Sequence, residues 1–212
     1  MKGSPVRYRL PLLILSLAAL AACEAVREAE EEVDEEIAEG LEQAGEAIER
    51  VLPDELSASD DLKQAMKEEE GEIDVVYRDL TGKPTVGVGH LVRPEDRLAV
   101  GQRVSREQID RFLDRDIQWA EDEVRKLARD TPLYQHEFDA LVDLVFNVGP
   151  GNVSPDRSPA LNDGLRRRDY RKVAENLIYS RDANGRPARG LQFRSDRRRQ
   201  IFEKGDYADP RR

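Results

Sequence analysis

Glu70, Asp79 and Thr85 are residue types that together can perform glycosidic cleavage. Asp79 stands nine positions after Glu70, and Thr85 stands six positions after Asp79. Such cleavage needs a carboxylic acid that protonates the leaving oxygen and a carboxylate on the other side of the sugar, and a hydroxyl group can orient the attacking water. The same residues also fit an exposed glutamate run, a turn aspartate and a strand threonine, so the spacing alone leaves both interpretations open.

A helix end and a hairpin would have to bring these three residues together. We expect a helix over residues 62–70 that ends at Gly71, because glycine is a favourable C-terminal cap. Residues 73–77 and 85–88 predict two strands, joined by a turn of the kind that makes a hairpin with a longer loop. The glutamate would then lie at the helix end, the aspartate at the first corner of the hairpin, and the threonine at the start of the return strand.

Most of the chain after the hairpin is predicted to be helical. A serine followed after three positions by a glutamine predicts a capping box at 105–108. Residues 137–148 are apolar on nearly every side, which is typical of a helix at the centre of a domain. More charged helices are expected near 159–167, 169–180 and 194–203. This pattern predicts an α+β, mostly helical fold in which a small lobe with a β-hairpin and a larger helical lobe flank a cleft.

The stretch around these three residues resembles the active-site region of the phage-type lysozymes, a family that includes endolysins and muramidases. The matching residues are Glu70-Gly71, Tyr77-Arg78-Asp79, Gly82 and Thr85-Val86-Gly87-Val88-Gly89-His90-Leu91. The resemblance continues at Phe146-Asn147-Val148-Gly149 and, more loosely, at Gly190-Leu191, Arg194 and Phe202. It covers about residues 62–205, and the acid-to-threonine spacing combined with Gly-x-Gly-His is a specific signature.

The resemblance implies a lysozyme-like fold that hydrolyses the β-1,4 bond between N-acetylmuramic acid and N-acetylglucosamine in the glycan strands of peptidoglycan, with no metal or cofactor. It implies that Glu70 is the general acid, that Asp79 acts on the attacking water or the developing cation, and that Thr85 helps to hold that water. Two alternatives are a lipoprotein that binds peptidoglycan without cleaving it and the same enzyme held by an uncleaved signal anchor. The intact set of three residues argues against the first.

The resemblance also implies supporting residues outside the first motif. His90 is expected to close the hairpin as a structural residue, and Asn147 follows the central helix motif. Arg194 is expected near the helix end that carries the general acid. Glu68 and Glu69 lack the required offset from the aspartate and are expected to be solvated. Two arginine runs, at 166–168 and 197–199, are expected to be solvated helix faces paired with nearby acids, with contact to anionic glycan or lipid as the alternative.

The N-terminal segment predicts export and a lipid anchor. Basic residues precede an apolar run at 10–22, which is shorter than the roughly 20 residues of a spanning helix. The run ends in Leu20-Ala21-Ala22-Cys23, which resembles a bacterial lipobox. We therefore expect a lipoprotein signal peptide over 1–22, a lipid on Cys23, and a membrane-anchored protein facing the periplasm at the outer membrane. An ordinary signal peptide with an incidental cysteine remains an alternative, as does the uncleaved anchor.

The formal charge of −10 is concentrated in one segment. Residues 24–57 contain fourteen acidic and two basic residues, with apolar positions at helical spacing. We expect an acidic helical tether over 23–57, with a short coiled coil as the alternative, and the lysozyme-like domain over 58–212. That domain is nearly neutral, which argues against nucleic acid as a partner. One cysteine and two histidines make a zinc cluster improbable, and we expect a monomer.

The lipobox assignment makes a direct prediction. Cys23→Ser should leave the precursor unprocessed and without lipid, because the thiol is the group that accepts the acyl-bearing modification. Mass spectrometry of the mature wild-type protein should find several acyl chains on an N-terminal cysteine, enough for stable anchoring where a single chain is marginal. A mature protein without acyl groups on this residue would contradict the assignment.

Overall fold

The computed structural model describes residues 49–79, 81–179 and 189–211 of the chain. The predicted signal peptide, the lipobox with Cys23 and most of the predicted tether lie outside the described residues. Within the described ranges, no helix is both long enough and apolar enough to cross a membrane. Residues Arg50–Arg212 pack as one unit.

A three-stranded antiparallel sheet forms the small lobe, with the strand order β1-β2-β3. The strands are β1 (Ile73–Arg78), β2 (Pro84–Gly87) and β3 (His90–Leu91). The first two are the hairpin that the sequence predicts. The third was not predicted, because two residues are too few to show an alternating pattern. Gly87 has a φ of +66°, and a methyl group there would lie 3.0 Å from the side chain of Ile109, so this glycine lets the sheet pack closely on a helix.

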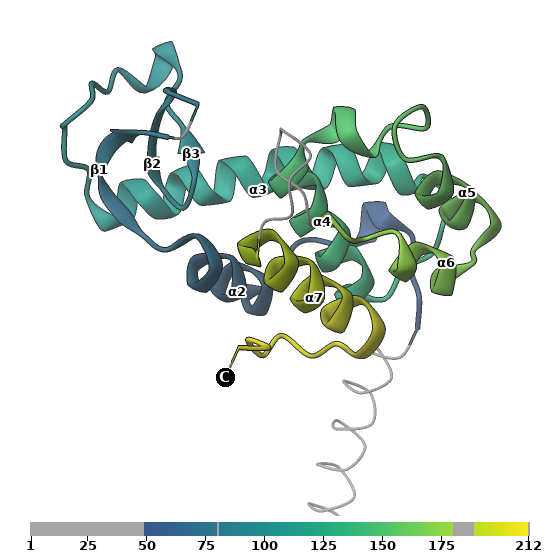
Figure 1. Ribbon diagram of the computed structural model, residues 1–212. Helices are drawn as coiled ribbons and strands as arrows, with labels where there is room; N and C mark the ends of the chain where they lie inside the picture. The colour runs from purple at the N-terminus through teal and green to yellow at the C-terminus, as the bar shows by residue number, and fades with distance from the viewer. Residues whose placement is uncertain (1–48, 80, 180–188, 212) are drawn as a thin grey trace, which may run out of the picture. The chain divides into compact units, whose positions relative to one another are not determined.

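Helices make up the larger lobe, as expected. They are α2 (Asp60–Glu70), α3 (Arg106–Ala128), α4 (Gln135–Val148), α5 (Pro159–Arg167), α6 (Tyr170–Glu175) and α7 (Arg189–Lys204), with short 3-10 helices η1 (Pro53–Glu55), η2 (Pro94–Asp96) and η3 (Pro150–Val153). Figure 1 shows the strands at one end of α3 and α5 at its other end, so α3 links the two lobes. The predicted mostly helical α+β fold is therefore confirmed.

The two longest helices follow from their sequence patterns. Helix α3 starts with the predicted capping box, in which the Ser105 side chain accepts from the Gln108 N–H and the Gln108 side chain accepts from the Ser105 N–H. Its buried residues recur at steps of three or four, which gives one apolar face. Helix α4 is buried at every position from Glu137 to Val145 and packs against both α3 and α7. Its predicted place at the centre of the domain is confirmed.

The helix predicted near 169–180 is shorter in the structure. Helix α6 covers Tyr170–Glu175 and ends at Asn176. Leu177 follows the helix and is fully buried. It is apolar because it packs in the core, and not because it continues the helical pattern. The helix predicted near 194–203 is longer in the structure, because α7 begins at Arg189.

The packed unit begins eight residues before the predicted domain boundary at 58. Val51 exchanges two backbone hydrogen bonds with Leu133, of 3.0 and 2.8 Å. The Arg50 guanidinium donates to both carboxylate oxygens of Glu137, at 2.9 and 2.8 Å. It also lies over the rings of Tyr134 and Tyr170, 4.1 and 3.7 Å from their centroids. Residues 50–57 therefore pack with the domain, although by composition they were counted with the acidic segment.

His90 fixes the hairpin to helix α3, the structural role that the sequence predicts. Its ring is 2% exposed and stacks on Phe112, 4.4 Å away. Nδ1 lies 2.6 Å from Asp116 of α3, and Nε2 lies 3.0 Å from Asp96 of η2. Burial, the largest single influence, lowers the pKa of His90, but the hydrogen bonds and charges of Asp116 and Asp96 outweigh it and raise the pKa above its ordinary value.

A pH-dependent stability follows from this raised pKa. The protonated ring is favoured in the folded state, so its contribution is complete below the unfolded pKa of about 6.5 and is lost as the pH rises through the folded pKa. His90→Gln should lower the free energy of unfolding by about 2 kcal/mol or more near pH ~5.5, as expected for a broken buried ion pair, and by less at alkaline pH. Denaturant unfolding at several pH values measures this difference.

Asp116→Asn is the matched variant for this test, because it removes the carboxylate that lies closest to the ring. It should show the same trend, with the largest loss of stability on the acid side of neutrality. If either variant loses the same free energy at every pH between about 5 and 9, the charged histidine is not what fastens the hairpin.

Candidate active site

Glu70 is the last residue of α2, and Gly71 follows it as the predicted cap, with a φ of +70°. Its side chain is 33% exposed. Its carboxylate accepts a hydrogen bond from Nη1 of Arg194. A methyl group on Gly89 would lie 3.8 Å from Cδ and Oε2 of Glu70, so the β2–β3 turn passes directly beside this carboxylate. The end of α2, the start of α7 and the sheet therefore meet at Glu70.

Arg194 reaches Glu70 from a buried position on α7. It is 6% exposed, and a second carboxylate, that of Asp143 in α4, accepts from its Nε at 3.2 Å and from its Nη2 at 2.7 Å. Asp143 also accepts from Nε of Arg198 at 2.6 Å. The expected position of Arg194 next to the general-acid candidate agrees with the structure.

Asp79 lies at the first corner of the hairpin, and its carboxylate is held by the turn itself. Its Oδ1 accepts from the N–H of Thr81, the hydroxyl of Thr81 and the N–H of Lys83, each at 2.8 Å. The N–H of Lys83 has the largest influence on the pKa of Asp79 and, together with Thr81, holds it below its ordinary value despite some desolvation. Asp79 is therefore kept as a carboxylate in a fixed orientation.

Thr85 and Tyr77 lie opposite each other on β2 and β1. Thr85 is 3% exposed, and its hydroxyl donates to the Lys83 carbonyl at 3.2 Å. Burial raises the pKa of Tyr77, and the charges of Glu70 and Asp79 raise it further. The phenol of Tyr77 therefore lies within the electrostatic influence of both carboxylates. The sequence showed it only as part of a motif and gave it no role.

Asn147 lies near the end of α4, and its Oδ1 accepts from Nη2 of Arg198 at 3.2 Å. It thereby joins the same buried arginine cluster as Arg194, and it is connected to Glu70 only through Arg198, Asp143 and Arg194. His90 does not take part in this cluster, because its partners are on α3 and η2. The structure thus groups Glu70, Asp143, Arg194, Arg198 and Asn147, and keeps His90 apart as a support of the hairpin.

The expectation that Glu68 and Glu69 are solvated was wrong. Arg197 donates to Glu68 at 2.8 Å and to Glu69 at 3.4 Å, and Arg211 donates to Glu69 at 3.2 Å. The Glu69 side chain is only 8% exposed. Both glutamates are therefore held in ion pairs on the face of α2 that packs toward α7 and the C-terminal segment.

The arginine run at 197–199 was also expected to be solvated, and two of its three members are buried. Arg197 and Arg198 are 4% and 1% exposed. Only Arg199 follows the expectation, with a 43% exposed side chain that pairs with Glu203. In the described ranges, no three His, Cys, Asp or Glu residues lie close enough to hold a metal ion.

Known proteins share both the sequence and the fold. The sequence model of the phage lysozyme family matches residues 67–200, which is more than half of the chain. The endolysin of Salmonella phage P22 is 41% identical over 85 residues, and the endolysin of Bacillus phage B103 is 30% identical over 125 residues. These matches cover 40% and 58% of this chain and 58% and 44% of the relatives. The chain thus spans about half the length of the curated relatives that it matches.

The fold is similar to that of an endolysin from Escherichia coli O157:H7 phage FAHEc1. The TM-score is 0.64 at 24% sequence identity, and the similarity covers 72% of this chain and 97% of the other. The helix end, the hairpin and the buried arginine cluster all lie within the matched region of the sequence. The chain belongs to the phage lysozyme family.

Proposed function

We propose that this protein hydrolyses the β-1,4 bond between N-acetylmuramic acid and N-acetylglucosamine in peptidoglycan. One observation carries the proposal, namely the presence of two carboxyl groups in unlike settings. Glu70 is accessible at a helix end and is held by the buried Arg194, whereas the hairpin turn keeps Asp79 ionised. Glycoside hydrolysis uses two carboxyl groups in unlike settings. Membership of a family that includes endolysins supports the same reaction class.

Glu70 is the proposed general acid. Its partial exposure lets it exchange protons with water and approach the glycosidic oxygen, whereas Arg194 keeps the carboxyl group from rotating away. Arg194 is itself fixed by Asp143, so the position of the acid depends on the core of the helical lobe. A group positioned in this way gains from orientation as well as from proton transfer.

Asp79 is the proposed partner on the other side of the sugar. Because three donors occupy its Oδ1, the remaining oxygen, Oδ2, is the one available to an attacking water or a developing positive charge; it has the Thr81 hydroxyl at 3.1 Å. Thr85, whose hydroxyl lies 3.2 Å from the Lys83 carbonyl, is the proposed third member that helps to hold the water. A peptidoglycan-binding protein that does not cleave is the alternative, and turnover on purified murein sacculi discriminates between the two.

We also propose that a lipid on Cys23 anchors the protein at a membrane facing the periplasm. The lipobox pattern at the end of the apolar N-terminal run supports this proposal. An acidic segment between the anchor and the domain would then give the enzyme reach toward its polymeric substrate.

Glu70→Gln should abolish most of the activity. The substitution keeps the size of the side chain and a hydrogen-bond acceptor for Arg194 but removes the transferable proton. Murein hydrolysis should fall by about 10²–10⁴-fold, the usual contribution of a general acid, while thermal unfolding stays cooperative. Release of soluble muropeptides from sacculi, followed by chromatography, measures the loss.

Glu69→Gln is the control for this prediction, since it changes the adjacent residue in the same helix. It should lower stability, because it weakens a buried ion pair with Arg197, and it should leave the turnover of the folded protein close to that of the wild type. Wild-type turnover in Glu70→Gln, or an equal loss in both variants, would exclude Glu70 as the acid.

Thr81→Ala should shift the pH dependence of activity. The variant removes a hydroxyl that donates to Asp79 and helps to keep its pKa low. The pKa of Asp79 then rises, so the acidic limb of the pH–rate profile should move to higher pH while the rate at alkaline pH changes little. An acidic limb that stays in place in a folded Thr81→Ala protein would mean that the ionisation of Asp79 does not limit the reaction.

A further inference from the structure

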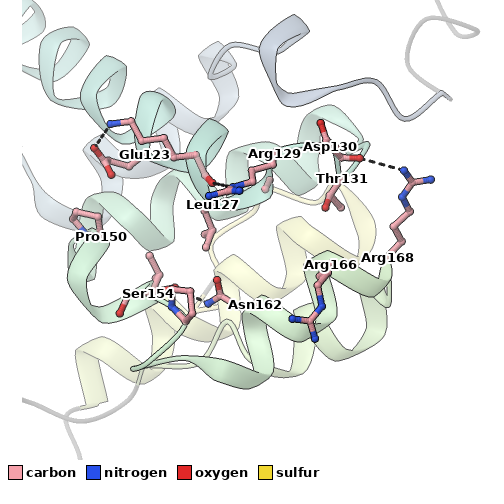
Figure 2. Close-up of a pocket in the computed structure, with 14 residues that line it drawn as sticks. Glu123, Leu127, Arg129, Asp130, Thr131, Pro150, Ser154, Asn162, Arg166 and Arg168 are labelled. Atoms are coloured by element: carbon pink, nitrogen blue, oxygen red, sulfur yellow. Dashed lines mark hydrogen bonds and ion pairs between the residues drawn. The ribbon is translucent and has the colours of Figure 1, made fainter.

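A cavity lies on the helical lobe, and Figure 2 shows the side chains that line it. It has a volume of about 580 Å³ and lies between the C-terminal end of α3, η3 and α5. None of the residues proposed for catalysis lines it. Its volume is within the range of pockets that bind small ligands, roughly 300–1,000 Å³.

The lining of this cavity is basic, although the domain that contains it is nearly neutral. Four cationic side chains line it, those of Lys126, Arg129, Arg166 and Arg168, against the carboxylates of Glu123 and Asp130. Lys126 pairs with Glu123 at 2.8 Å. In Figure 2 the labelled side chains encircle the cavity and do not converge on one point. The charges therefore suit an extended ligand with several charged groups better than a single small ion.

Two of these arginines lack a carboxylate partner. Nε of Arg129 donates to the carbonyl of Lys126 at 3.3 Å, and Nη2 of Arg168 donates to the carbonyl of Asp130 at 3.2 Å. Among the residues that the structure describes, neither guanidinium has an Asp or Glu oxygen within 4.0 Å, in contrast to Arg166, which pairs with Asp163. Each guanidinium is thus steadied by one backbone carbonyl and keeps further N–H donors for a ligand.

The same two arginines adopt backbone conformations that favour glycine. Arg129 follows α3 with a φ of +46°, and Arg168 follows α5 with a φ of +56°. Glycine is the usual residue at such helix ends because a Cβ atom makes positive φ unfavourable. At both positions an arginine occupies a backbone conformation that is unfavourable for any residue with a Cβ atom. Both arginine side chains line the same cavity. Backbone strain of this kind often accompanies binding sites.

We propose that this cavity binds a short peptide that carries both carboxylate and ammonium groups, the class to which the stem peptides of peptidoglycan belong. The arginines would bind carboxylates, and Asp130 would bind an ammonium group. Leu127, Val153 and Pro155 supply apolar surface for small side chains. The proposal rests on the proposed function, since the substrate glycan is what brings stem peptides to this enzyme. It adds a contact outside the site of cleavage, which would strengthen binding of the polymer.

The test uses the full-length protein in detergent and the free tetrapeptide L-alanyl-D-glutamyl-diaminopimelyl-D-alanine in isothermal titration calorimetry. The wild type should bind one equivalent saturably. Arg129→Gly combined with Arg168→Gly should raise Kd at least tenfold. Glycine suits both backbone conformations, so the double variant should melt at the same or a higher temperature than the wild type, and lost binding cannot then be ascribed to unfolding.

Arg97→Gly is the matched control. Arg97 is the other described non-glycine residue with positive φ, at +53°, and it follows η2, away from the cavity. Its replacement should change Kd less than twofold. No binding by the wild type, or equal binding by the double variant, would overturn the proposal. Arginine-dependent binding of phosphatidylglycerol vesicles without peptide binding would also overturn it, in favour of a phosphate site.

Turnover separates this proposal from the proposed function. On peptide-bearing peptidoglycan, the double variant should raise KM several-fold with kcat unchanged, and on peptide-free glycan it should match the wild type in both. If the wild type cleaves neither substrate, the proposed function fails, while the calorimetric result still decides the peptide site. If cleavage is normal but the double variant has a normal KM on both substrates, the cavity has no part in substrate binding.

Discussion

The pairing of Asp143 with two arginines is the interaction on which the site and the helical lobe both depend. Asp143 lies in the centre of the apolar helix α4, and Arg194 and Arg198 approach it from α7. Burial raises the pKa of its carboxyl group, but the two guanidinium charges more than compensate and lower the pKa to about 2. Buried charges are tolerated only when they are paired and hydrogen-bonded. The relative position of α4 and α7 is therefore fixed by electrostatics as well as by packing.

This pairing determines where the candidate general acid stands. Arg194 has one end of its guanidinium on Asp143 and the other on Glu70, so three helices meet at one side chain. Asp79 is positioned in the opposite manner, by hydrogen bonds within a turn of five residues. One carboxyl group thus depends on contacts between residues more than fifty positions apart and the other on local chain geometry. The two groups can be tuned separately, which suits a reaction that needs one protonated and one ionised carboxyl group.

The sequence was sufficient to predict the elements that carry the site, because they depend on local signals. Gly71 ends α2, alternation and turn residues produce the hairpin, and the capping box starts α3. Apart from Arg194 beside Glu70, which the family resemblance implied, the buried ion pairs were not predicted. Glu69 and Arg197 look like solvated surface residues in their own segments, and they become buried only because residues 128 positions apart in the chain meet in the fold. Asp143 could have indicated these pairs from the sequence. A carboxylate inside an otherwise apolar helix is buried, and a buried carboxylate needs a charged or hydrogen-bonding partner.

The small lobe adds a second electrostatic constraint to the first. In the proposed reaction, Asp79 can act with Glu70 only if the hairpin keeps its place against α3, and His90 holds it there through Asp116. The close contact of Gly87 with Ile109 contributes packing at the same junction. The helical lobe is secured by arginines, which stay charged at all ordinary pH values, whereas the hairpin is secured by a histidine, whose charge changes near neutrality. As the pH rises, the hairpin should therefore loosen before the helical lobe does, and the carboxylate of Asp79 would shift relative to Glu70 while the arginine cluster around Asp143 is still intact.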